Sequence, residues 1–154
     1  QYAYTYAKAH PGTVAAGSFY PANAKWQDDF ACACAELYWA TGIESYKTEA
    51  LSYAGNLGNH NWCYNYNNND DIAAYNLAKL GSASALTLFN TFVSTYKSAV
   101  NASGLYTGGD ATWGPLRYNA NAAFIVALHG AYNNETTVNT FIYKNIDYII
   151  TTFI

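Results

Sequence analysis

The sequence has little charge and no methionine. Of the 154 residues only 11% are charged, the Lys and Arg residues are scattered singly, and the formal net charge is −3. Nucleic acids and anionic membrane surfaces bind clustered positive charge, so neither is expected as a partner. No apolar run approaches the length of a membrane span, and no signal peptide is recognisable. From the start at Gln1 we expect a processed or partial chain.

Cysteine is also scarce, which limits the covalent chemistry. The three cysteines are Cys32, Cys34 and Cys63. Cys32 and Cys34 lie two positions apart on a predicted helix and point in different directions, so at most one disulfide can form. The histidines are separated from the cysteines by spacings that zinc sites do not use. We therefore predict no metal, no cofactor and no Ser–His or Cys–His nucleophile.

Aromatic residues are abundant, because the sequence contains 16 Tyr and 4 Trp, and 51% of its residues are hydrophobic. A chain of this length and composition can bury a core, and we expect a single domain over residues 1–154. Tyr and Trp combine a flat apolar face with a polar edge, which suits contact with sugar rings. Composition alone nevertheless favours ordinary packing over a sugar site.

Hydrophobic residues recur at three- and four-residue steps along nearly the whole chain, which predicts an all-α protein. The predicted helices, about seven in number, have their periodic residues within 2–9, 26–42, 43–57, 72–80, 88–100, 117–132 and 138–154. Gly42 ends the second helix. Ser82 or Ser84 can cap the fifth, and Thr136 or Thr137 can cap the last.

The short links between successive helices predict antiparallel α/α hairpins. Consecutive hairpins of this kind form a toroid, a superhelix or a bundle. The helix at 117–132 is rich in alanine, and small side chains let neighbouring backbones approach closely. We therefore place this helix inside the structure.

Four stretches narrow these alternatives: Phe19-Tyr20, Trp26 to Gly42, Trp62 to Leu80, and Trp113 to Phe124. In this order they resemble glycoside hydrolase family 9, whose members are mostly endo-β-1,4-glucanases built as an (α/α)6 barrel. The most specific pattern is Trp-Gly-x-Leu-Arg-Tyr-x-x-Asn-Ala-Ala-Phe in the last stretch. The resemblance implies that the helices form part of such a barrel, as an open arc.

The same resemblance implies inverting hydrolysis, in which one carboxylate activates water and another protonates the leaving oxygen. The base of the family lies in an Asp-x-x-Asp motif upstream of the matching region, and the acid is a Glu downstream of a His-x-Arg motif. Neither motif occurs in this sequence. Asp28 and Asp29 cannot replace them, because adjacent helical side chains diverge by about 100°. This chain alone is therefore expected to be inactive, with no catalytic residue assigned.

The resemblance assigns seven residues to sugar subsites: Trp62, Trp113, Arg117, Tyr118, Phe19, Tyr20 and Asn67. An indole packs against the face of a glucose ring, and polar side chains take the hydroxyls on its rim. Asn67 stands where the family usually has an acid, and an amide is a weaker acceptor for a hydroxyl. Core packing is the alternative for the two tryptophans. Arg117 could instead pair with Asp110.

Two main hypotheses follow. The chain is a segment of an endo-β-1,4-glucanase that binds β-glucan, or it is a catalytically inactive glycan-binding or self-assembling subunit derived from that family. A different α/α-toroid glycosidase is a third alternative. The open arc must be covered by the remainder of the barrel or by self-association. We expect a secreted protein, with sequons that permit N-glycosylation at Asn101 and Asn134.

Overall fold

The computed structural model describes residues 2–14, 25–60, 62–65, 68–108, 114–137 and 139–152. Its elements are α1 (Tyr2–Ala9), α2 (Gln27–Thr41), α3 (Glu44–Ser52), the 3-10 helix η1 (Ala54–Asn56), α4 (Asp70–Lys79), α5 (Ala83–Ser98), α6 (Pro115–Tyr132) and α7 (Thr140–Thr152). Within the described ranges, β-pairing is limited to two isolated bridges. The prediction of an all-α protein is confirmed.

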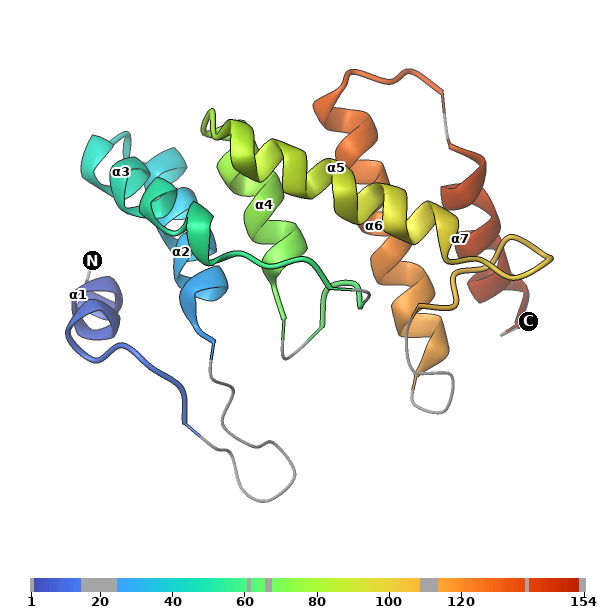
Figure 1. The fold of residues 1–154 in the computed structure, drawn as a ribbon, viewed down its shortest axis with the longest axis horizontal. Helices are drawn as coiled ribbons and strands as arrows, with labels where there is room; N and C mark the ends of the chain where they lie inside the picture. The colour runs from blue at the N-terminus through green and yellow to red at the C-terminus, as the bar shows by residue number, and fades with distance from the viewer. Residues whose placement is uncertain are drawn as a thin grey trace.

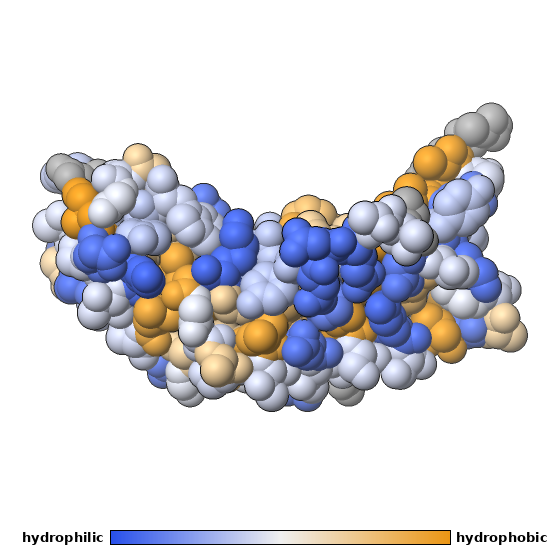
Figure 2. All heavy atoms as spheres, turned by 90° about the horizontal axis from the view of Figure 1, so that it is seen from above, coloured by the Kyte–Doolittle hydropathy of each residue, from blue (hydrophilic) through white to orange (hydrophobic). Residues whose placement is uncertain are grey.

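Three hairpins make up most of the molecule (Figure 1). α2 packs against α3, α4 against α5, and α6 against α7, while α2 also packs against α4 and α4 against α6. The first helix of each hairpin therefore belongs to an inner layer, in which neighbouring helices lie close together, and the second belongs to an outer layer. Figure 2 shows the resulting shape, a curved shell that is hollow on one side. The hairpins form an open arc, as the sequence predicted.

Hydrophobic side chains between the helices form two buried clusters. The first includes Phe30, Cys34, Ala50, Leu77 and Leu80. The second includes Phe89, Phe92, Tyr96, Ile125 and Phe141. Alanines at the contacts of the inner layer, among them Ala31, Ala73 and Ala122, are fully buried. Their small side chains allow α2, α4 and α6 to approach one another closely.

Two helix ends follow local sequence signals. Gly42 adopts the left-handed conformation (φ 70°), and its N–H donates to the Tyr38 carbonyl at the end of α2. Ser82 caps α5, because its hydroxyl oxygen accepts the N–H of Ala85 at 3.3 Å. Of the two predicted caps for this helix, Ser82 is the one used.

The start of the last helix differs from the prediction. α7 begins at Thr140, and the side-chain oxygen of Asn139 accepts the N–H of Phe141 at 2.9 Å. Thr136 and Thr137 precede the helix, so the prediction that one of them caps it was wrong. The reason is the turn after α6, where Asn134 adopts a positive φ of 55° and the chain needs the following residues to cross to α7 (Figure 1).

The inner helices share one direction, which positions the candidate site. α2, α4 and α6 all begin at the lower edge of the molecule in Figure 1. Trp62, in the described part of the segment before α4, and Arg117, in the first turn of α6, therefore both belong to this edge.

In the part of the chain that the structure describes, no helix has both the length and the hydrophobicity that a membrane span requires.

Candidate functional site

The segment that precedes α4 is held by hydrogen bonds from three helices. The backbone N–H of Tyr64 donates to the Asp71 carboxylate on α4 at 2.8 Å. The Tyr96 hydroxyl on α5 lies 2.9 Å from Asp71 Oδ2 and 3.3 Å from the carbonyl oxygen of Trp62. From α6, the side-chain amide of Asn121 donates to the Tyr64 carbonyl at 2.6 Å. The backbone that carries the Trp62 side chain is therefore held in place by α4, α5 and α6.

Cys63 lies within this segment and has a structural role. The thiol is fully buried and donates to the carbonyl oxygen of Tyr118 at 3.4 Å. Burial raises the pKa of Cys63 to about 12 and that of Cys32 also to about 12. Both thiols therefore stay protonated at neutral pH and are poor nucleophiles. All three cysteines are free in the structure.

The structure brings Trp62, Tyr118 and Arg117 together. The Trp62 side chain is 47% exposed, and its ring meets the Tyr118 ring edge to face, with centroids 5.6 Å apart and an interplanar angle of 77°. The exposed Arg117 guanidinium lies 4.7 Å from the centroid of the same Tyr118 ring, a cation–π contact. Tyr118 is only 4% exposed. Its ring thus supports two exposed side chains, one with an apolar face and one with five N–H donors.

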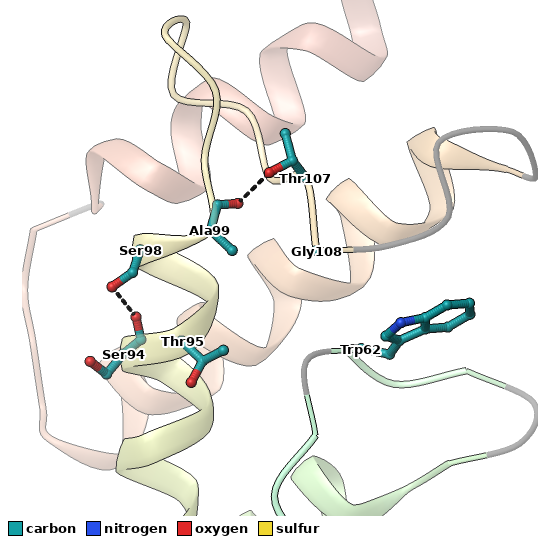
Figure 3. A pocket seen from close by; sticks show the side chains of 7 residues that line it. All are labelled: Trp62, Ser94, Thr95, Ser98, Ala99, Thr107 and Gly108. Atoms are coloured by element: carbon teal, nitrogen blue, oxygen red, sulfur yellow. Dashed lines mark hydrogen bonds between the residues drawn. The ribbon is translucent and has the colours of Figure 1, made fainter.

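A hollow with several hydroxyl side chains in its lining lies between Trp62 and the end of α5 (Figure 3). It is lined by Trp62, Ser94, Thr95, Ser98, Ala99, Thr107 and Gly108. Two of its hydroxyls donate within the protein, from Ser98 to the Ser94 carbonyl and from Thr107 to the Ala99 carbonyl. Their oxygens keep lone pairs that can accept hydrogen bonds. In Figure 3 the Trp62 indole extends away from α5, so this hollow flanks the indole rather than enclosing it.

Carboxylates join the beginnings of α2 and α4. Buried Asp28 accepts the backbone N–H of Asn69 at 2.8 Å, and exposed Asp29 accepts the Asn69 side-chain amide. The two aspartates thus diverge into different surroundings, as their adjacent helical positions require. Their hydrogen bonds tie α2 to the segment that precedes α4.

The aspartates at the start of α4 are both buried. Asp70 forms an ion pair with Lys25, and His60 Nε2 lies 3.6 Å from its other oxygen. Desolvation raises the pKa of Asp71, although the N–H of Tyr64 and the Tyr96 hydroxyl donate to its carboxylate. Both residues lie in the first helical turn, where negative charge is favourable. Among the described residues, no group of three or more His, Cys, Asp and Glu side chains could hold a metal ion.

The inner layer has a second hollow, on the open side of the shell. It is lined by Cys32, Glu36, Tyr64, Asn69, Ile72, Tyr75, Asn76, Phe124 and Leu128. Phe124 on α6 is 50% exposed there. The alanine-rich helix α6 is therefore buried on one face only, and its other face is open in this chain.

Four of the seven candidate residues, Phe19, Tyr20, Asn67 and Trp113, lie outside the described residues, so their roles stay predictions. The alternative partner of Arg117, Asp110, lies outside them too.

Sequence reasoning missed a buried asparagine whose hydrogen bonds connect α7 to the start of α6 and to the loop after α5. Asn145 on α7 is fully buried and accepts the N–H of Tyr106 at 2.9 Å and the amide of Asn119 at 2.6 Å. Its own amide donates to Phe141 and Gly104 carbonyls. An asparagine on the apolar face of a predicted helix was the available signal, because such a residue must be hydrogen-bonded when buried.

Comparisons with known proteins relate this chain to cellulases. Endoglucanase A of Fibrobacter succinogenes is 29% identical over 168 aligned positions, and the alignment covers 96% of this chain and 35% of that protein. The crystal structure of the cellulase Cel9M of C. cellulolyticum in complex with cellobiose superposes with a TM-score of 0.82 at 26% identity, covering 96% of this chain and 36% of that one. A second Cel9M structure gives the same TM-score at 25% identity. The chain thus spans only 35–36% of the length of these relatives.

The solved relatives are (α/α)6 barrels, so the three hairpins form part of such a barrel, as the sequence predicted. The profile of glycosyl hydrolase family 9 matches residues 1–150, nearly the whole chain. Fold, motif order and profile agree that this chain belongs to glycosyl hydrolase family 9.

Proposed function

We propose that this chain contributes β-1,4-glucan subsites to an endo-β-1,4-glucanase domain and does not itself carry the Asp and Glu that cleave the bond. One observation carries the proposal: the exposed Trp62 indole and the exposed Arg117 guanidinium rest on the same buried ring, Tyr118. The indole offers an apolar face to a sugar ring, and the guanidinium offers donors to its hydroxyls.

The surroundings of Trp62 support a sugar as the ligand. The hollow beside the indole presents hydroxyl oxygens of Ser98 and Thr107, which can accept hydrogen bonds from sugar hydroxyls. The related Cel9M has been solved with cellobiose. Phe19, Tyr20, Asn67 and Trp113 would supply further sugar contacts, as the sequence predicts.

The three buried aspartates at the starts of α2 and α4 support the view that the cleaving acids lie elsewhere. Inverting hydrolysis needs one acid and one base that flank the scissile bond with room for a water molecule. Asp28, Asp70 and Asp71 are buried and are already bonded to protein groups. None of them can act as the acid or the base without losing the hydrogen bonds or the ion pair that hold the segment before α4.

Binding by the purified protein tests the proposal. Isothermal titration with cellotetraose should show binding, and Trp62→Ala should weaken it more than tenfold, as expected for loss of an aromatic platform. Trp39→Ala is the matched control, because Trp39 is also partly exposed, at 38%, but lies near the C-terminal end of α2, away from Trp62. Equal affinity in the two variants would refute the sugar role of Trp62. Release of reducing sugar from β-glucan by this chain alone would refute the proposed inactivity.

A second candidate is a non-catalytic subunit that assembles through its open surfaces. On α7 the side chains of Tyr143, Ile146, Tyr148 and Ile150 are 38–65% exposed, and hydrophobic atoms face outward at that end of Figure 2. Such a surface needs a cover, which the remainder of a barrel or another copy of the chain can provide. Sedimentation of the native protein separates the cases: a species larger than 16.9 kDa made only of this chain favours self-association. A longer polypeptide favours the barrel.

We also propose that the protein is secreted. The sequons at Asn101 and Asn134 both lie in exposed positions of the structure. Occupied sequons require passage through a secretory pathway in a cell that performs N-glycosylation. A mass decrease of the native protein after treatment with a peptide-N-glycosidase is the expected result, and no decrease would leave these sites without support.

A further inference from the structure

The Trp62 indole is partly exposed, and the ring contact that the described residues show for it is with Tyr118. Its ring touches Tyr118, and 47% of the side chain faces solvent. An aromatic platform binds a sugar more tightly when its orientation is fixed before binding, because ordering it afterwards costs free energy. Side-chain torsions are set relative to the backbone that carries them. The orientation of the indole therefore depends on what holds the backbone of residues 62–64.

A buried pair holds that backbone. Asp71 and Tyr96 are both fully buried, and the Tyr96 hydroxyl lies 2.9 Å from Asp71 Oδ2. The same hydroxyl lies 3.3 Å from the Trp62 carbonyl oxygen, and the same carboxylate oxygen accepts the N–H of Tyr64 at 2.8 Å. The pair thus contacts the backbone on both sides of Cys63.

The pair is itself fixed to the two layers of helices. The second oxygen of Asp71 accepts the N–H of Ile72 at 2.9 Å, within the first turn of α4. The Tyr96 ring packs among Phe92 and Tyr106 in the second buried cluster, with centroids 6.1 and 5.5 Å away. Hydrogen bonds in such a water-free environment are strong and hold their geometry. The rigidity of the core is thereby transmitted to an exposed segment.

We propose that Asp71 and Tyr96 are positioning residues for Trp62: they fix the backbone on both sides of residue 63 and so hold the indole in the orientation that receives the sugar. This inference rests on the proposed function, because it assumes that Trp62 binds sugar. It adds two buried residues from different helices to the sugar-contacting residues that the sequence motifs assign.

Tyr96→Phe tests the inference, because it removes one hydroxyl and keeps the packed ring. The protein is labelled with 5-fluorotryptophan, and the fluorine resonance of Trp62 is assigned with Trp62→Phe. In Tyr96→Phe we expect the Trp62 resonance to shift or broaden while those of Trp26 and Trp39 stay in place. Cellotetraose affinity should fall about fivefold to tenfold, as expected for one lost hydrogen bond.

Further variants keep the test decisive. Tyr46→Phe is the matched control, because Tyr46 is also buried but lies on α3, away from this segment; it should change neither readout. Asn121→Ala removes the separate hydrogen bond from α6 to the Tyr64 carbonyl without opening the core. It should move the Trp62 resonance in the same way if the backbone sets the indole. If Tyr96→Phe does not fold, Asp71→Asn tests the other member of the pair.

An unmoved Trp62 resonance in Tyr96→Phe, or in Asp71→Asn if Tyr96→Phe does not fold, would overturn the inference. A moved resonance with unchanged affinity would also overturn it, provided that Trp62→Ala abolishes binding in the same assay. If Trp62→Ala leaves binding unchanged, the sugar proposal fails instead. The fluorine resonances then still decide whether Asp71 and Tyr96 position the indole.

Discussion

The indole of Trp62 meets the Tyr118 ring edge to face at a centroid distance of 5.6 Å, although Trp62 lies before α4 and Tyr118 lies in the first turn of α6. Tyr118 is buried, and Trp62 is half exposed. The contact joins the segment before α4 to the first turn of α6 across the lower edge of the arc in Figure 1. The site is therefore a property of two hairpins together, and its integrity depends on the packing between them.

The first prediction concerns this shared ring. Tyr118→Ala should lower the free energy of unfolding by about 3–5 kcal/mol, because it removes a buried aromatic side chain. It should also weaken cellotetraose binding, since Trp62 and Arg117 both lose their support. Tyr118→Phe keeps the ring and should retain most of the stability. Urea unfolding followed by circular dichroism measures the difference, and equal stability of the Ala and Phe variants would contradict the packing role.

The second prediction compares a buried ion pair with an exposed one. Lys25→Met should destabilise the protein by about 3 kcal/mol, because it leaves the Asp70 carboxylate, 2% exposed, without its cation. Lys8→Met breaks the pair with Glu49, in which the Lys8 side chain is 52% exposed, and should leave the urea midpoint nearly unchanged. The measurement is urea unfolding at neutral pH. Equal destabilisation by the two substitutions would show that burial of Asp70 does not increase the contribution of its ion pair to stability.

The third prediction concerns pH. Burial raises the pKa of Asp71 in the folded state above its ordinary value of 3.8, so the native protein holds this proton more tightly than the unfolded chain. The contribution of Asp71 to stability is therefore largest below pH 3.8 and is lost as the pH rises through the raised pKa. Asp71→Asn cannot titrate. The stability of the native protein minus that of Asp71→Asn should fall with rising pH, by at most about 1.4 kcal/mol per pH unit.

Urea unfolding of both proteins at a series of pH values measures this difference, and the other carboxylates cancel because both proteins contain them. A difference that rises with pH would mean that the hydrogen bonds from Tyr64, Tyr96 and Ile72 outweigh desolvation.

The fourth prediction concerns the buried asparagine on α7. Asn145→Ala should lower the free energy of unfolding by about 3 kcal/mol, because the N–H of Tyr106 and the amide of Asn119 lose their acceptor in a buried site. Asn90→Ala, at an exposed position on α5, is the control and should change stability by less than about 0.5 kcal/mol. Thermal unfolding gives both values. A small effect at Asn145 would indicate that water replaces the lost carbonyl oxygen.

Most of the helices could be predicted from the sequence, because helical periodicity and caps are local. The stop at Gly42, the cap at Ser82 and the extent of α6 depend on residues within a few positions of one another. The cap of α7 could not be predicted in the same way. Whether Thr136, Thr137 or Asn139 begins that helix depends on how far the chain must travel from α6, which is a distance in the folded molecule.

The sequence by itself determined the family resemblance, the all-helical class and the grouping of Trp62 with Arg117 and Tyr118 as candidate residues, because these follow from motifs and their order. Only the tertiary structure decided that Tyr118 is a buried support beneath two exposed side chains, and that Asp71 and Tyr96 hold the backbone of Trp62. The physical reason is that burial and hydrogen bonding are relations between residues far apart in the chain. They exist only once α4, α5 and α6 have packed together.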